Sequence, residues 1–173
     1  MSQQPPHDLI AALEAGRQDV ASAALGMTDE QAKLKPAPDR WSVLDALEHL
    51  TVVEERFLIW VESGKPMDAP NPDLAKESSL KAMMADRSSK REAPEAVVPS
   101  GRFPTVAAAL AQFHTMRDRA VQMATERGAE LYAIGAQHPR FGLMNGVETL
   151  HLAAGHASRH AAQMREARAV LGF

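Results

Sequence analysis

Two histidines near the end of the chain have the spacing of metal ligands. His156 and His160 are four residues apart in the stretch 147–171, which is rich in Ala, Leu, Met, Glu and Arg and therefore favours a helix. On a helix, side chains four residues apart share one face, with Cβ atoms roughly 5–6 Å apart. Two imidazole nitrogens at that separation can both reach one ion at about 2.0–2.1 Å. The pair therefore predicts one wall of a metal site.

The spacing alone leaves two interpretations open. With seven histidines in 173 residues, such a pair often arises by chance, and helix-face histidines hydrogen-bonded to their neighbours would look the same. A third histidine favours the metal. His49 shares a helical face with the apolar residues Ala46, Val53, Phe57 and Trp60. An unpaired polar group in a core costs on the order of 1–3 kcal/mol, and three inward histidines on facing helices avoid this by sharing a cation.

The charged side of the helix that carries His49 is predicted to hold Glu48, Glu54, Glu55 and Glu62. The other four histidines are weaker candidates. His114 lies beside the apolar stripe of its helix and is an additional candidate for lining the pocket. His151 lies about 140° around the helix from His156, so we expect it to pack or to face solvent. We expect His138 to be solvated in a loop and His7 to start a helix.

Composition limits the chemistry and the partners. The chain has no cysteine, which excludes disulfides, a thiolate nucleophile and cysteine-held zinc. Histidine-rich ligation suits Zn or Ni, also Fe or Cu, and argues against Mg or Ca. A net charge of −3 offers no basic face for nucleic acid. The N-terminus lacks a signal-peptide pattern and no run has the ~20 apolar residues of a membrane span, so we expect a cytoplasmic protein without a membrane partner.

Helices are predicted to position these side chains. Aromatic residues make up 5% of the chain and helix formers are plentiful, which favours an all-α fold in a single domain over residues 1–173, with 1–6 disordered. Four long helices are expected over about 8–25, 43–62, 106–127 and 147–171, and a shorter extra helix over about 73–91. Close packing is expected at Gly16, since glycine in mid-helix costs about 1 kcal/mol.

Long connections separate these helices. Residues 63–72 and 94–104 are predicted to cross the ends of a four-helix bundle, with two short extended pieces around Val97–Val98 and Phe103. Residues 129–145 are predicted to be irregular. These three segments are expected to form the mouth of the pocket, because loops commonly carry the residues that select a substrate.

Three segments together resemble the DinB-like superfamily. They are residues 41–50, WSVLDALEHL, residues 141–150, FGLMNGVETL, and residues 156–164, HASRHAAQM. The resemblance covers the whole chain in helix order and spacing. It implies a four-helix bundle with an up-down-down-up course, and a divalent metal held by His49, His156 and His160. It also implies outer or helix-packing roles for Arg159 and Gln163.

Three neutral imidazoles would leave a coordination position open for water or a thiolate, as in a catalytic zinc site. The resemblance implies a metal-dependent enzyme of the thiol S-transferase or hydrolase type, acting on a small thiol and an electrophile, and a homodimer. The alternative is a non-catalytic, stress-related module that binds metal or dimerises. Asp45 and Glu148 lie on faces that suit a general base, but both are equally suited to capping helices.

Overall fold

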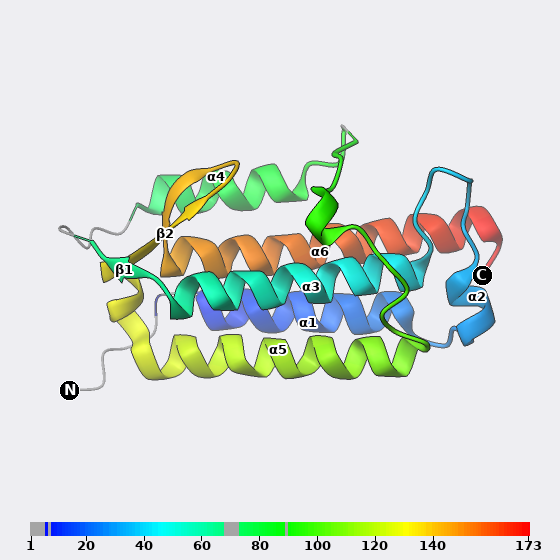
Figure 1. Ribbon diagram of the computed structural model, residues 1–173, viewed down its shortest axis with the longest axis horizontal. Helices are drawn as coiled ribbons and strands as arrows, with labels where there is room; N and C mark the ends of the chain where they lie inside the picture. Colours follow the sequence, from blue (N-terminus) through cyan, green and yellow to red (C-terminus); the bar gives the residue numbers. More distant parts are fainter. Residues whose placement is uncertain (1–5, 7, 68–72, 89) are drawn as a thin grey trace.

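The computed structural model describes residues 6, 8–67, 73–88 and 90–173. The expected disorder of residues 1–5 and the helix start at His7 lie outside this part of the chain, as do residues 68–72 of the first predicted crossing. Within the described residues, four long helices form a bundle (Figure 1). They are α1 (Leu9–Ala24), α3 (Val43–Glu62), α5 (Val106–Arg127) and α6 (Gly146–Leu171).

The helices follow the predicted up-down-down-up course. The colours in Figure 1 show α1 and α6 running one way and α3 and α5 the other. Each long helix packs against two others, in the cycle α1, α6, α3, α5. The helices α3 and α6 are therefore antiparallel neighbours, and this pairing brings their histidines face to face. No helix among the described residues is both long and apolar enough to cross a membrane.

Local sequence signals set where the long helices begin. Ser42 and Asp45 form a capping box at the start of α3, and Asn145 and Glu148 form another at the start of α6. The Thr105 side chain accepts from the backbone N–H of Ala108 at the start of α5. These caps therefore define the first turns of the two helices that carry the histidines, α3 and α6.

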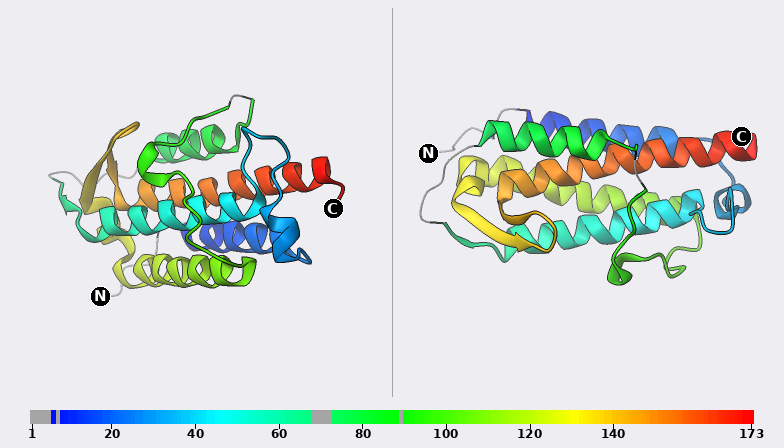
Figure 2. Two further views of the ribbon diagram at one scale, coloured as in Figure 1. Left: turned by 45° about the vertical axis from the view of Figure 1, so that its right-hand side comes forward. Right: turned by 90° about the horizontal axis from the view of Figure 1, so that it is seen from above.

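Shorter elements cover the bundle. The helix α2 (Asp29–Lys33) lies at one end, and α4 (Leu74–Ala85) packs along α6 (Figure 2). The extra helix was predicted to reach residue 91 but ends at Ala85. Directly after it, Asp86 accepts from the backbone N–H of Ser88, a local turn that competes with helix. The second crossing holds a 3₁₀ turn, η1 (Glu95–Val97), so of the extended piece predicted around Val97–Val98 only Val98 has an extended backbone. There the Val97 N–H donates to the Pro94 carbonyl, and Phe103 is not in a strand either.

The stretch predicted to be irregular is ordered. A 3₁₀ segment, η2 (Gly128–Ala133), leads into an antiparallel hairpin of β2 (Ile134–His138) and β3 (Gly142–Asn145). The short strand β1 (Lys65–Pro66) pairs with β2, which gives the strand order β1-β2-β3. The hairpin closes where His138 pairs with Gly142, whose φ of 72° suits glycine. The prediction failed because these strands are too short to show a clear alternation of apolar and polar residues.

The expected close packing at Gly16 is confirmed. A Cβ at this position would lie 3.0 Å from the Ala154 carbonyl oxygen and 3.2 Å from the Ala157 Cβ, so glycine lets α1 approach α6 closely. The core continues on both sides of this contact. Its largest fully buried apolar side chains include Leu13, Leu47, Leu50, Leu58, Phe113, Leu150, Leu152 and Met164.

Candidate metal centre

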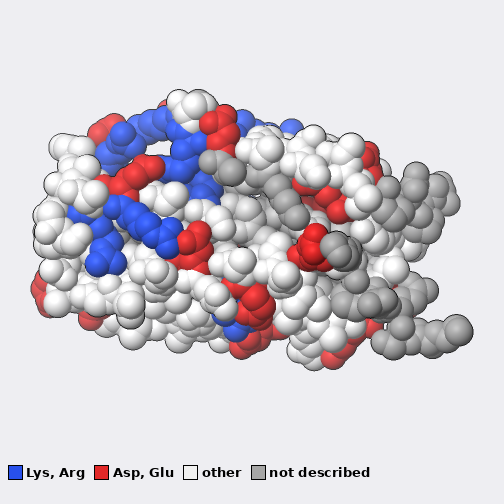
Figure 3. Space-filling model, turned by 180° about the vertical axis from the view of Figure 1, so that it is seen from behind, with Lys and Arg blue, Asp and Glu red and all other residues white. Residues whose placement is uncertain are grey.

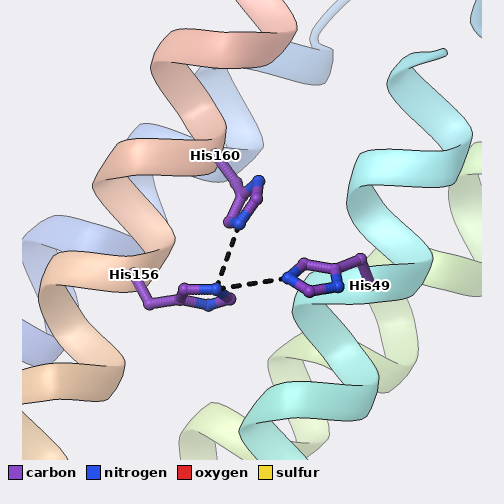
Figure 4. Close-up of side chains that lie close together, drawn as sticks. All are labelled: His49, His156 and His160. Atoms are coloured by element: carbon purple, nitrogen blue, oxygen red, sulfur yellow. Dashed lines mark hydrogen bonds between the residues drawn. The ribbon is translucent and has the colours of Figure 1, made fainter. Parts of the chain in front are cut away.

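The three predicted ligands converge. His49 extends from α3, and His156 and His160 extend from consecutive turns of α6 (Figure 4). The Nε2 atom of His156 lies 3.3 Å from Nε2 of His49 and 3.0 Å from Nε2 of His160. One nitrogen from each ring fits within a group whose members are all within 4.8 Å of one another. No other group of three or more His, Cys, Asp or Glu side chains among the described residues is placed to hold a metal.

These separations suit a transition metal. Two nitrogens that each lie about 2.0–2.1 Å from one tetrahedral ion are roughly 3.3 Å apart. The two measured separations of 3.3 and 3.0 Å are close to that value. An ion could therefore sit between the rings after small changes in ring orientation.

Two of the rings have an oxygen acceptor at Nδ1. Nδ1 of His49 lies 2.8 Å from the Val97 carbonyl oxygen, and Nδ1 of His160 lies 2.8 Å from Oε1 of Gln163. Both nitrogens face oxygen acceptors, so each donates its N–H. The proton of a neutral imidazole is then used, and Nε2 of each ring presents a lone pair towards His156.

Hydrogen bonds to protein groups do not satisfy the ring nitrogens of His156 and its two neighbours. Nε2 of His156 faces both lone pairs, and an N–H there could point fully at one of them but not at both. Among the residues that the structure describes, no hydrogen-bond partner reaches its buried Nδ1. With its proton on Nδ1 instead, three lone pairs would face one another. A cation at that point satisfies all three, so the donor set fits a metal.

Burial keeps the three imidazoles neutral. It is the largest cause that lowers the pKa of His49, and it lowers the pKa of His160 to about 3 with help from His49. The pKa of His156 falls well below its usual value because of burial, followed by the nearby His160 and His49. Metal binding requires neutral imidazoles, so these side chains are ready to bind at neutral pH.

Aromatic side chains line the cluster. The Trp41 ring lies 4.7 Å from the His49 ring and 6.2 Å from the His160 ring, measured between centroids. Phe57 meets His156 edge-on at 6.1 Å. These rings place apolar surface beside the nitrogens, which lowers the local dielectric and strengthens electrostatic interactions there.

The residues expected around the ligands have distinct roles. Gln163 is the partner of His160 described above. Arg159 is 8% exposed and donates to the Asp86 carbonyl, so it ties the end of α4 to α6. Asp45 and Glu148 both take part in capping boxes, and Glu148 also lies 2.8 Å from Nζ of Lys76. Of the two interpretations of these carboxylates, the structure favours capping over a general base.

Other histidines lie apart from the cluster. His114 contacts the Phe113 ring, and the expected packing of His151 is found, since it is 2% exposed. The solvated loop predicted for His138 was wrong. His138 lies in β2, and its ring contacts three aromatic rings, at centroid distances of 6.3, 5.1 and 4.6 Å from Phe57, Trp60 and Phe141. The hairpin that was not predicted carries it to this place.

Two glutamates predicted on the charged face of α3 are buried. Glu48 is 3% exposed and Glu54 is 1% exposed. Each has polar partners that sequence spacing does not reveal. Glu48 binds the backbone of residues 100–102, and Glu54 pairs with Arg117 of α5. The sequence held one indication of the pair between Glu54 and Arg117, because Arg117 lies within the apolar stripe of its helix.

Comparisons with known proteins agree with this architecture. A family model described as the DinB superfamily matches residues 12–164. The uncharacterized protein YuaE of Bacillus subtilis is 24% identical over 141 residues, which cover 82% of this chain and 85% of YuaE. The solved structure of YfiT from Bacillus subtilis aligns with a TM-score of 0.61 at 19% identity, covering 96% of this chain and 87% of that one. YfiT is described as a probable metal-dependent hydrolase with an unusual four-helix bundle topology.

Proposed function

The chain belongs to the DinB superfamily, and from this premise we propose that it is a metal-dependent enzyme whose divalent ion is held by His49, His156 and His160. The observation that carries the proposal is the meeting of three Nε2 atoms, because Nδ1 of His49 and of His160 each faces an oxygen acceptor and leaves a lone pair on Nε2. Three like bases facing one another in a core are explained most simply by a shared ion.

The side chains around the ion would prepare it for catalysis. Such a metal supplies Lewis acidity and lowers the pKa of a water or thiol that it binds at an open position. Val97 and Gln163 orient His49 and His160 by accepting their N–H groups. Trp41 and Phe57 exclude water from two sides of the ring cluster, because their rings pack against it.

We favour hydrolysis or thiol transfer on a small electrophilic molecule. The description of YfiT supports a hydrolase, and the resemblance in the histidine segments supports a thiol S-transferase. The ligand set favours Zn or Ni over harder ions. A homodimer and a cytoplasmic location are further parts of this proposal, and a nucleic-acid partner is not, since the net charge is −3.

The test begins with metal content. Protein purified without an affinity tag should contain about one transition-metal ion per chain by elemental analysis, and His160→Ala should lose it with its helical circular dichroism unchanged. His114→Ala is the matched control, because His114 is a histidine of α5 outside the cluster. Wild-type protein that binds neither zinc nor nickel would overturn the proposal.

Activity separates the enzyme from the alternative module. Zinc-loaded and nickel-loaded protein would be assayed for hydrolysis of activated esters and amides, and for conjugation of small thiols to an electrophile. We expect turnover that chelators abolish and that His160→Ala lacks. Tight metal binding without any turnover, combined with an obligate dimer by light scattering, would favour the non-catalytic module instead.

A further inference from the structure

Residues 97–102, which we call the strap, lie along α3 and contact two consecutive residues of that helix. The Val97 carbonyl accepts from His49, and the backbone of residues 100–102 donates to Glu48. We propose that Glu48 is a positioning residue that sets the tautomer of His49 by holding the strap in place. This inference rests on the proposed role of His49 as a metal ligand.

The Glu48 carboxylate is fully engaged by the strap. Its Oε1 accepts from the Ser100 backbone N–H at 2.6 Å and from the Ser100 hydroxyl at 3.1 Å. Its Oε2 accepts from the backbone N–H groups of Gly101 at 3.0 Å and Arg102 at 2.8 Å. Four donors thus converge on one carboxylate that is 3% exposed. Hydrogen bonds to an ionised group are roughly twice as strong as neutral ones, so this is a firm attachment.

The backbone of the strap is shaped for an anion. Gly101 has a φ of 83°, a conformation that side-chain-bearing residues rarely adopt. This turn lets three successive N–H groups point to the same side, the arrangement known as an anion nest. The chain fills its own nest with Glu48, so the carboxylate and the glycine depend on each other.

A short and stiff link connects the nest to the metal ligand. Val98 has φ −69° and ψ 135°, and Pro99 has a ring that fixes its φ. Val97 itself is 6% exposed. A displacement of the nest therefore moves the Val97 carbonyl, which lies 2.8 Å from Nδ1 of His49. Without that acceptor, the proton of His49 has no reason to remain on Nδ1, and its Nε2 lone pair is no longer assured.

Neighbouring positions on the helix make this coupling direct. Side chains of consecutive helical residues point about 100° apart, so Glu48 and His49 reach two points of the same strap. A purely structural carboxylate would stabilise the fold without affecting the imidazole. The positioning role predicts in addition a change at His49 that is visible in metal-free protein.

The key variant is Glu48→Gln. It keeps the shape but turns one of the two acceptor atoms into an NH₂ that faces backbone donors. Glu55→Gln is the matched control, since Glu55 contacts the strap only through the Arg102 side chain, at 3.2 Å. Histidine ¹⁵N spectra of metal-free protein should show His49 as the Nδ1–H form in the wild type and in the control. In Glu48→Gln they should show a mixture of both tautomers.

Zinc affinity gives the second readout. Calorimetry with a competing chelator should show zinc binding weakened about tenfold or more in Glu48→Gln, as for other partners of metal-bound histidines, and unchanged in Glu55→Gln. A wild-type His49 spectrum together with wild-type zinc affinity in Glu48→Gln would overturn the inference. If Glu48→Gln does not fold, Gly101→Ala disturbs the same nest from the other side and carries the same expectations.

The two proposals fail in different ways. If wild-type protein binds no zinc, the proposed function fails, while the tautomer spectra of metal-free protein still decide whether Glu48 positions His49. If zinc binds and His160→Ala abolishes binding but Glu48→Gln leaves both readouts unchanged, only the inference about Glu48 fails.

Discussion

Glu54 and Arg117 lie deeper in the bundle than the three histidines, with side-chain exposures of 1% and 0%, whereas His156 is partly exposed. Nε of Arg117 is 2.9 Å from Oε1 of Glu54, and its Nη atoms donate to Glu54 and to the Leu13 and Ala153 carbonyls. Arg117 therefore binds groups on α1, α3 and α6 from its place on α5. The Nε2 atoms of the histidine cluster, by contrast, connect α3 to α6, and its further bonds to oxygen are those of His49 to Val97 and of His160 to Gln163.

The contrast is one of charge balance. The ion pair contains opposite charges, and its guanidinium also donates to backbone carbonyls of α1 and α6, so both charges find their partners within the chain. The cluster contains bases of one kind, and the metal-binding group that includes them consists of histidines alone among the described residues. A buried polar centre that is complete serves to hold helices together. A buried centre that consists only of uncharged bases is suited to bind a positively charged ligand.

Breaking the ion pair should give the largest loss of stability. Glu54→Leu leaves a guanidinium that cannot lose its proton, and we expect a cost of about 3–5 kcal/mol. Arg117→Met should cost less, because burial raises the pKa of Glu54 to about 7 and the carboxyl can take up a proton. Urea unfolding at pH 7 measures both variants.

Arg119→Met is the control for the ion pair. Arg119 lies on the same helix and pairs with Glu62, but both side chains are nearly half exposed, so the change should cost under ~1 kcal/mol. Equal costs for Glu54→Leu and Arg117→Met would contradict the argument that the carboxyl is the partner that can be neutralised.

Zinc bound at the histidine cluster should stabilise the folded protein, by less than the loss expected for Glu54→Leu. At a free concentration 100 times its Kd, a ligand that binds the folded chain alone adds about 2.7 kcal/mol to the free energy of unfolding. Wild-type protein should show this increase in urea titrations, and His156→Ala should not. Arg117→Met, which leaves the three histidines in place, should keep most of it. Loss of the zinc effect in Arg117→Met would mean that the two centres are not independent.

The sequence was sufficient to predict the long helices and the spatial proximity of the three histidines. Ser42, Thr105 and Asn145 mark helix starts by side-chain chemistry that acts within three residues, so local reasoning finds them. The pairing of His156 with His160 follows from helical spacing. That His49 meets them was predicted from its apolar helix face and then from the family resemblance, because no local pattern encodes the packing of α3 against α6.

The partners of buried glutamates could not be predicted in the same way. Glu48 appeared to lie on a charged face, yet it binds backbone N–H groups some fifty residues further along the chain. Backbone donors have no signature in the sequence beyond Gly101, which permits their turn. The hairpin of β2 and β3 was missed for a similar reason. Its short strands contact α3 and α6 as well as each other, and such contacts with distant helices have no local pattern in the sequence.

Lowering the pH should reduce the free energy of unfolding through the histidine cluster and increase it through Glu54. In metal-free protein the folded-state pKa of His160 is about 3, below its usual 6.5, so the unfolded chain binds more protons as pH falls from 6.5. Stability is then lost by about 1.4 kcal/mol per pH unit for each such histidine. Glu54, raised from 4.5 to about 7, holds a proton in the folded chain over the same range and gains stability as pH falls.

Urea unfolding between pH 4.5 and 6.5 with a chelator present separates these contributions. His160→Gln should make the loss of stability with acid shallower, because one proton-binding group of the unfolded chain is removed. Glu54→Gln should make it steeper, because the opposing contribution disappears. Identical pH slopes in wild type and both variants would show that neither centre titrates as its burial predicts.

The smallest effects should come from adding one methyl group beside each centre. A Cβ at Gly16, next to Arg117, would lie 3.0 Å from the Ala154 carbonyl oxygen, and two bundle helices would have to separate. Overpacking costs about 1–3 kcal/mol, and the gain in helix propensity returns about 1, so Gly16→Ala should lose about 1 kcal/mol.

A Cβ at Gly155, next to His156, would instead meet the Cβ of Met84 at 2.9 Å. Met84 belongs to α4, which packs against α6 and lies outside the cycle of four long helices (Figure 3 views the molecule from behind Figure 1). Gly155→Ala should therefore change the free energy of unfolding by less than Gly16→Ala, with zinc affinity within about threefold of wild type. A larger loss at Gly155 would mean that α4 is held as rigidly as the four long helices, and that the metal centre lies in a closed core like that of the ion pair.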